Sequence, residues 1–246
     1  MSARCDFSYR HYRELVAAIL GSGHEITPLG EYQRVPGKVC LWRHDVDFCL
    51  RTALEHAHLD HEVGVRATFF VRVHAPSYNI LSAESARTLA EMAGLGHEIG
   101  LHTEPMFHLQ RGRDPNVELH ADVRLLSAAV GAEVRAVARH QPARFPAQVA
   151  DEERYLSAYG PALESFQYFS DSRGLWVRGC PCTQADRHPR LHLLTHPIWW
   201  SEGGDSWDER ISAVAGSVLG ALEQEFSSYR ESVRAARDRV EPSAPG

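Results

Sequence analysis

Two acidic side chains stand close together at the end of a short apolar run. Residues 39–42 are apolar, follow a Pro-Gly pair, and are typical of a strand buried in a sheet. Because side chains alternate along a strand, Arg43, Asp45 and Asp47 project to one side and His44 to the other. Neighbouring carboxylates repel each other unless a cation or a shared proton relieves them, so the pair predicts a metal site or acid/base chemistry. The alternative is structural: one carboxylate caps the next helix and the other pairs with an arginine.

Further polar residues follow other predicted strands. His102 and Glu104 end a run over residues 97–104, while His140 and His196 end two later runs. In an α/β barrel the carboxyl ends of the strands converge on one mouth, so these side chains can share a cavity with the two carboxylates. Carboxylate together with imidazole suits zinc, iron, manganese or cobalt better than magnesium or calcium. A metal there could activate water while an aspartate and a histidine move protons, which is the outline of amide or ester hydrolysis.

The elements that must position these residues alternate along the chain. A predicted strand at 39–47, a helix at 50–62 and a strand at 65–73 form a parallel βαβ unit. Further strands are predicted at 97–104, 134–140, 166–169, 175–177 and 191–200, helices at 7–20, 85–93, 115–130 and 211–235, and a helix or two turns within 148–163. A single α/β domain follows, and a barrel is favoured over an open sheet because no glycine-rich phosphate loop follows the first strand.

We expect the barrel to span residues 37–235, preceded by an N-terminal helix and lead-in loop at 1–36 and followed by a flexible tail at 236–246. The chain of 246 residues is 43% hydrophobic and 24% charged, with a net charge of −6, which argues against binding nucleic acid or anionic membranes. No apolar run approaches the roughly 20 residues that span a bilayer. No hydrophobic signal-peptide segment opens the chain, and this favours a cytosolic protein.

Cysteine usage favours the same compartment. The five cysteines are an odd number with no spacing typical of a disulfide framework, as expected in a reducing cytosol. Cys180-Pro181-Cys182 is shorter than the Cys-x-x-Cys pair that binds zinc, so ordinary free thiols are predicted there.

Four stretches resemble, in order, the motifs of the polysaccharide deacetylases, which include chitooligosaccharide and peptidoglycan deacetylases. They are Arg-His-Asp-Val-Asp at 43–47, Ala-Thr-Phe-Phe at 67–70, Gly-His-Glu-Ile-Gly-Leu-His at 96–102 and Leu-Leu-Thr-His at 193–196. The first of these, together with Asp-Ser-Arg-Gly-Leu-Trp at 171–176 and Thr-His-Pro-Ile-Trp-Trp at 195–200, is similar more narrowly to deacetylase-like proteins of bacterial surface-polysaccharide biosynthesis. The resemblance implies a distorted (β/α)7 barrel and metal-dependent removal of an acetyl group from an N-acetylated sugar.

The resemblance also implies roles for the residues that match its motifs. Asp45 takes the position of the catalytic base, and Asp47 and His102 take those of metal ligands. The family's remaining ligand lies four residues after His102, where this chain has Met106, a poor ligand for a hard ion. Glu104 is our first choice to replace it because it lies two residues after His102. His108 and His140 are the alternatives.

His196 matches the general acid of the family, with Leu194 as part of the acetyl pocket. Asp171 and Trp176 fall near the motif that orients this histidine and walls the pocket. His140 falls where the family has an arginine that orients the base, so it is also a candidate supporting residue, as is Arg43.

We therefore expect a divalent metal, with zinc favoured and iron, cobalt or manganese as alternatives, and a carbohydrate or sugar-linked substrate. Met106 motivates a second hypothesis, a catalytically retired barrel that binds a carbohydrate or a protein partner. A third retains the metal and acts on another carbon–nitrogen bond. The sequence leaves the oligomeric state open.

Overall fold

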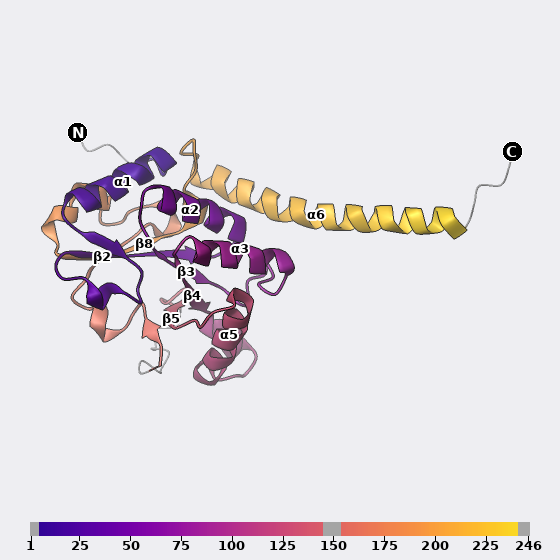
Figure 1. Cartoon of the computed structure of the whole chain (residues 1–246), viewed down its shortest axis with the longest axis horizontal. Helices are drawn as coiled ribbons and strands as arrows, with labels where there is room; N and C mark the ends of the chain where they lie inside the picture. Colours follow the sequence, from indigo (N-terminus) through magenta and orange to yellow (C-terminus); the bar gives the residue numbers. More distant parts are fainter. Residues whose placement is uncertain (1–4, 145–153, 241–246) are drawn as a thin grey trace.

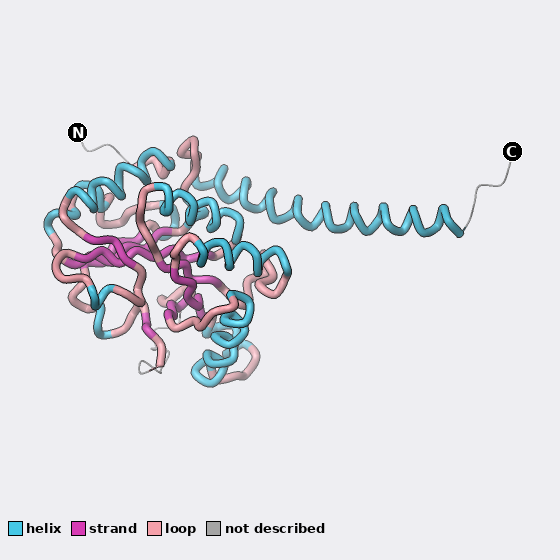
Figure 2. The backbone as a smooth tube through the Cα atoms, in the orientation of Figure 1, coloured by secondary structure: helices cyan, strands magenta, loops and turns pink. Residues whose placement is uncertain are grey.

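The centre of the molecule is a curled sheet in which all neighbouring strands are parallel (Figures 1 and 2). This is a computed structural model that describes residues 5–144 and 154–240. The strands are β1 Glu25–Thr27, β2 Val39–Val46, β3 Thr68–Val71, β4 Glu98–Thr103, β5 Ala136–Arg139, β6 Leu156–Ser157, β7 Gln167–Ser170 and β8 Arg190–Thr195. Their order is β6-β5-β4-β3-β2-β8-β7, with β1 paired to the start of β2. The sheet is a curled half-barrel, which confirms the predicted distorted (β/α)7 barrel of the deacetylase type.

Helices cover the outer face of this sheet (Figure 1). The helices of the barrel are α1 Tyr9–Gly21, α2 Leu50–Glu62, α3 Ala83–Gly94, α4 Pro105–Gln110 and α5 Pro115–Val130, and the last helix, α6 Trp207–Val240, extends away from it (Figure 1). Short 3₁₀ turns lie between these elements: η1 Tyr32–Arg34, η2 Pro161–Leu163, η3 Ser172–Gly174, η4 Pro181–Thr183, η5 Ala185–Arg187 and η6 Pro197–Trp199. Strand alternation separates two apolar clusters. Phe69 packs in the large outer cluster with the helices, whereas Phe70 belongs to a smaller cluster with Leu41 and Ala138.

Local sequence signals account for the helix ends. The Ser8 hydroxyl accepts a hydrogen bond from His11 N at the start of α1. The Asp114 carboxylate does the same for α5, whose first residue is Pro115, and Gly131 ends that helix with φ 76°. The bounds of α5 and α2 are therefore those predicted from the sequence.

One glycine lets two strands approach closely. A Cβ added to Gly100 in β4 would lie 2.5 Å from Cε1 of Phe70 and 3.0 Å from the Ala136 carbonyl oxygen. Only glycine fits between these neighbours without displacing backbone or a buried ring. The residue thus holds β4, and with it His102, close to β3 and β5.

Some predicted elements need correction. The strand predicted at 175–177 is wrong: this stretch is irregular, between Gly174 and Gly179, which have φ of 69° and 80°. The strand predicted at 65–73 is shorter, and β1 and α4 were not predicted. Part of the region predicted as 148–163 lies outside the described residues, and the described part holds β6 and η2.

Helix α6 begins earlier and ends later than predicted, and it projects far from the barrel (Figure 1). Residues 236–240 of the predicted tail are helical, and 241–246 lie outside the described residues. Within the part of the chain described, no helix combines the length and the hydropathy required to cross a bilayer.

Candidate metal and catalytic site

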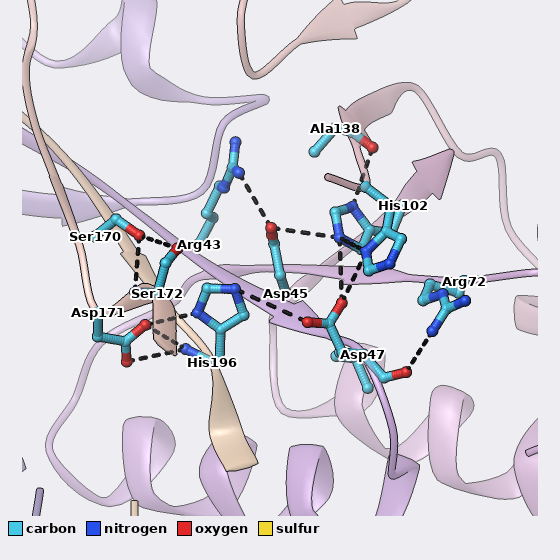
Figure 3. Close-up of polar contacts among 12 residues, drawn as sticks. Arg43, Asp45, Asp47, Arg72, His102, Ala138, Ser170, Asp171, Ser172 and His196 are labelled. Atoms are coloured by element: carbon cyan, nitrogen blue, oxygen red, sulfur yellow. Dashed lines mark hydrogen bonds and ion pairs between the residues drawn. The ribbon is translucent and has the colours of Figure 1, made fainter. Parts of the chain in front are cut away.

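Strand β2 delivers three charged side chains to the inner side of the curled sheet (Figure 3). Arg43 and Asp45 lie within the strand and Asp47 directly after it, while His44 points to the outer side, as strand alternation predicts. Arg72 of the segment after β3 donates a hydrogen bond to the Asp47 carbonyl oxygen at 2.9 Å. This bond fixes the backbone at the point where Asp47 leaves the sheet.

Three potential metal ligands meet at this end of the sheet. Asp47 Oδ1 lies 3.4 Å from His102 Nε2 and 3.2 Å from His140 Nδ1, and the two imidazole nitrogens are 3.3 Å apart. Bonds of about 2.0–2.2 Å from zinc to nitrogen and oxygen give ligand separations of roughly 3.4 Å in a tetrahedron. Asp47 Oδ1 is buried and has no hydrogen-bond partner. The three atoms therefore fit a divalent ion in both spacing and chemistry.

The two histidines of this group are held differently. His102 is 2% exposed, and its Nδ1 donates to the Ala138 carbonyl oxygen at 3.1 Å, which leaves Nε2 as the atom directed at Asp47. His140 follows β5, and its backbone N–H donates to the Thr103 carbonyl oxygen. Burial opposes ionisation of Asp47, but contacts with His102 and His140 hold the pKa of this carboxyl well below its usual value.

Asp45 stands next to these ligands with a separate partner. Its Oδ2 accepts a hydrogen bond from Arg43 Nη2 at 3.1 Å and lies 3.5 Å from His102 Nε2, while Oδ1 is buried without a partner. Arg43 is itself fixed by Tyr159, whose hydroxyl accepts a bond of 2.6 Å from the same nitrogen and whose ring lies under the guanidinium. Arg43 thereby orients Asp45 and leaves one carboxylate oxygen available.

His196 approaches from β8, opposite this group (Figure 3). Its Nδ1 is 2.6 Å from Asp171 Oδ1, and its Nε2 is 4.0 Å from Asp47 Oδ2. Asp171 is fully buried and also accepts bonds from the His196 N–H and from Trp200 Nε1. Burial opposes protonation of His196, but the Asp171 carboxylate, with Asp45 and Asp47 nearby, raises its pKa to about 9. The imidazolium is therefore the stable form at neutral pH.

Glu104 is directed elsewhere. Its carboxylate forms an ion pair with Arg72 at 2.5 Å and accepts a hydrogen bond from the His74 N–H at 3.0 Å. Strand β4 ends at Thr103, so the alternation that places every second residue on one face does not extend to Glu104, which has φ −117° and ψ 73°. The structure brings His140, rather than Glu104, together with Asp47 and His102.

The other residues near the motif after His102 face away from this group. Met106, in α4, is 36% exposed. His108 Nε2 is 2.8 Å from Asp122 Oδ2, and the other oxygen of Asp122 is 3.0 Å from His74 Nε2.

The two remaining candidates are Leu194 and Trp176, and they have different neighbours. Leu194 is buried and pairs in register with Arg43, on the side of β8 that carries His196. Trp176 stacks on Phe7 of the N-terminal segment, with ring centroids 6.4 Å apart. Its indole nitrogen is buried without a hydrogen-bond partner.

Sequence reasoning missed a small pocket beside the two carboxylates. It is lined by Asp45, Val46, Asp47, Phe48, Cys49, Thr52, Pro197, Ile198 and Val214. Val214 belongs to α6, whose first turns close this side of the pocket. The apolar face of α6 was visible in the sequence, but its position over the pocket was not.

No family model matches the chain, and no curated protein matches it either. Three solved structures illustrate what it is similar to. A family 4 carbohydrate esterase from Bacillus anthracis is 18% identical, with 85% of this chain and 86% of that chain covered and a TM-score of 0.45. A family 4 pseudoenzyme from the same organism is 15% identical, with 73% and 61% covered and a TM-score of 0.43.

A Streptococcus pyogenes deacetylase in complex with acetate is 12% identical, with 76% and 80% covered and a TM-score of 0.45. In fold, this chain resembles polysaccharide deacetylases. It spans less than two thirds of the length of the pseudoenzyme. These likenesses concern the fold, and the chemistry has to be argued from the residues described above.

Proposed function

We propose that the protein is a metal-dependent hydrolase that removes an acetyl group from an N-acetylated sugar or glycan. One observation carries this proposal: the ligand atoms of Asp47, His102 and His140 lie 3.2–3.4 Å from one another, with a second carboxylate and a protonated histidine on either side. Bound there, a divalent ion of the zinc, iron, cobalt or manganese kind would polarise the acetyl carbonyl and acidify water. We assign Asp47, His102 and His140 as its ligands.

The proton transfers fall to the residues beside the ligands. Asp45 has one oxygen held by Arg43 and the other free, so it can accept a proton from the attacking water. His196 is kept protonated by Asp171 and presents Nε2 toward Asp47, so it can donate a proton to the departing sugar nitrogen. The two groups work in opposite directions, one accepting and the other donating a proton.

A small pocket beside this pair offers apolar walls to the acetyl methyl group. Val46, Pro197 and Ile198 supply apolar walls close to both carboxylates, which suits a methyl group. Arg43, Asp171 and Leu194 act as supporting residues. The role first given to Glu104 passes to His140, and Glu104 instead holds Arg72 against the Asp47 backbone.

The proposal is tested by measuring bound metal and acetate release on the same protein. Elemental analysis of the purified chain and of the chain reconstituted with zinc, cobalt or iron gives the metal content. Acetate release is then followed with N-acetylglucosamine oligomers. We expect metal-dependent release. A protein that binds metal but releases no acetate supports the second hypothesis, a retired barrel, or the third, a hydrolase of another carbon–nitrogen bond.

Asp45→Asn separates the base from the ligands. Because its partner is Arg43 rather than the metal group, we expect the metal content to stay and kcat to fall by about 10²- to 10⁴-fold, the usual contribution of a general base. Asp47→Asn, two residues further along the chain, is the matched variant and should lose metal. Metal loss in the first and retention in the second would exchange the two roles.

A further inference from the structure

A second group of side chains that could bind a metal ion joins α1 to η4, and none of its members has a role in the proposed reaction. The ligand atoms of Cys5, His11 and Cys180 all lie within 4.8 Å of one another. His11 Nε2 is 3.4 Å from Cys180 Sγ and 3.9 Å from Cys182 Sγ. Three thiols therefore surround one imidazole nitrogen, and they come from two ends of the chain.

The two distances from His11 Nε2 are close to those of a tetrahedral zinc site. Zinc bonds of about 2.3 Å to sulfur and 2.0–2.1 Å to nitrogen place the nitrogen and sulfur ligands roughly 3.5 Å apart. The two measured distances from His11 Nε2 lie on either side of this value. The other ring nitrogen of His11 is 3.1 Å from Glu14 Oε2, an arrangement that fixes the tautomer of zinc-binding histidines.

The surroundings suit a buried ion. His11 is 4% exposed, and all the cysteines of the group are free and partly buried. No disulfide therefore competes with a metal ion for these thiols.

We propose that Cys5, His11, Cys180 and Cys182 form a structural zinc site of the Cys₃His type. The four protein ligands leave no open position, which is typical of structural rather than catalytic zinc. The site would tie the segment before α1 to η4, two stretches separated by about 170 positions in the sequence. The prediction of ordinary free thiols at residues 180–182 considered only the short spacing between these two cysteines.

The location suggests what this tie supports. Phe7 lies between Cys5 and His11, has φ 55°, and contacts the rings of Trp176 and Trp200. Trp200 donates its indole N–H to Asp171, which holds His196. Zinc would therefore stabilise the wall behind the proposed general acid, a consequence that rests on the proposed function.

Cobalt substitution tests the site in the full-length chain. Thiolate ligands give cobalt an intense near-ultraviolet charge-transfer band, whereas the carboxylate and imidazole ligands of Asp47, His102 and His140 do not. We expect this band in the wild type and in Asp47→Ala, and its loss in Cys180→Ser. Cys49→Ser removes a thiol outside the group and should retain the band.

Elemental analysis gives the corresponding count. We expect two zinc ions for each wild-type chain, and one each for Asp47→Ala and Cys180→Ser. If the proposed function is wrong, the zinc ion near Asp47 should be missing, whereas the charge-transfer band of the cysteine site should remain. Absence of the band in the wild type, or a disulfide joining Cys180 to Cys5 or Cys182 by mass spectrometry, would overturn the zinc proposal.

A second, independent observation concerns α6. Its first turns are attached to the barrel through Arg210, Val214 and Ser217. Beyond them, large apolar side chains are exposed along one face at alternating spacings of three and four, the pattern of a coiled-coil seam. These residues are Leu219, Leu222, Phe226, Tyr229 and Val233, with exposures of 60%, 50%, 68%, 69% and 37%.

The charges beside this seam identify the occupant. Of the residues that flank the seam, the acidic Glu223 and Glu225 precede its centre, whereas the basic Arg230 follows it. In an antiparallel pair of α6 helices, Phe226 of one copy can lie level with Tyr229 of the other. This register places the acidic Glu223 near the basic Arg230 of the other copy. We infer that the seam pairs two copies of this chain, because the interface is then self-complementary about a twofold axis.

Light scattering coupled to size exclusion tests this pairing. We expect a dimer for the wild type and a monomer for Phe226→Glu, while Gln224→Glu, outside the seam, remains dimeric. Glu223→Arg and Arg230→Glu should each weaken the dimer and restore it when combined, since the two residues are too far apart to meet within one helix. A monomeric wild type would overturn the antiparallel pairing. So would rescue of Arg230→Glu by Glu225→Arg rather than by Glu223→Arg, because a parallel pair of helices places residue 225 near residue 230 of the other copy.

Discussion

Strand β2 carries two histidine–aspartate groups, one on each face, and they differ in how completely their polar atoms are paired. On the outer face, His44 Nε2 is 2.9 Å from Asp60 Oδ2, and the Tyr12 hydroxyl donates to Asp60 Oδ1 at 2.6 Å. His44 Nδ1 is 2.8 Å from the Thr195 hydroxyl, which also accepts a bond from Trp42 Nε1. Each side-chain nitrogen and oxygen of these five residues has a partner.

On the inner face the same residue types are left partly unpaired. Oδ1 of Asp45 and Oδ1 of Asp47 have no hydrogen-bond partner, and His140 and His196 keep 17% and 12% of their side chains exposed. A satisfied buried network stabilises a fold, whereas unpaired buried acceptors need a ligand, a metal ion or a reacting group. Residue type alone therefore does not separate structure from chemistry, and these two groups differ in their pairing. Pairing is not uniform on the outer side, because both ring nitrogens of the buried His56, which packs edge-on to His44, have no hydrogen-bond partner.

The largest effect should come from removing a ligand of the inner group. We expect His140→Ala to lower metal affinity by more than the roughly 10- to 100-fold that loss of a supporting residue costs, and to abolish acetate release. Isothermal titration with zinc measures the affinity. Glu104→Gln is the matched control and should retain metal, since Glu104 pairs with Arg72. The opposite pattern would return the third ligand to Glu104.

Asp60→Ala should act on stability instead. It leaves His44 and the Tyr12 hydroxyl buried without their partner, so we expect a loss of about 3–5 kcal/mol in the free energy of unfolding. Urea denaturation measures it, and metal content should not change. Asp47→Ala in the metal-free protein provides the contrast: Asp47 Oδ1 lies 3.2–3.4 Å from His140 and His102 but makes no hydrogen bond, so we expect a smaller loss. Equal destabilisation by both changes would erase the distinction between the two faces.

The outer pair also predicts a pH dependence of stability. Burial opposes ionisation of Asp60, but His44 and Tyr12 hold the pKa of this carboxyl below its ordinary value. The stabilisation is therefore fully present above the unfolded pKa of about 3.9 and is lost as the pH falls through the folded value. In Asp60→Ala this loss at acid pH should be smaller, as measured by urea denaturation at a series of pH values.

The smallest effect is expected from Asp171→Asn. Asp171 raises the pKa of His196 to about 9, so removing its charge should lower that pKa and shift the alkaline limb of kcat to lower pH. We expect kcat at neutral pH to fall by about 10- to 100-fold with little change in metal content. An unchanged alkaline limb would show that His196 is not the proton donor.

Much of this arrangement was predictable from the sequence. The alternation of Arg43, His44, Asp45 and Asp47 assigned each side chain to the correct face of β2, because strand geometry depends only on neighbouring residues. The parallel barrel followed from alternating strand and helix patterns for the same reason.

The remaining features depend on contacts between distant segments. We chose Glu104 over His140 by strand alternation, but β4 ends at Thr103. Glu104 instead pairs with Arg72, which follows strand β3. The cysteine group escaped notice because Cys5 and Cys180 meet only after α1 packs beside η4. The pattern of neighbouring residues in the sequence therefore predicts the helices and strands and the face on which each side chain lies. The partner of each side chain depends on the assembled fold.

The projecting α6 governs how the protein moves through water. A helix of 34 residues extends about 51 Å at 1.5 Å per residue. A compact chain of 246 residues has a radius of gyration of roughly 18 Å. The helix enlarges the friction of the particle far more than its mass, so even a single chain should elute from a sizing column ahead of globular proteins of 27.5 kDa.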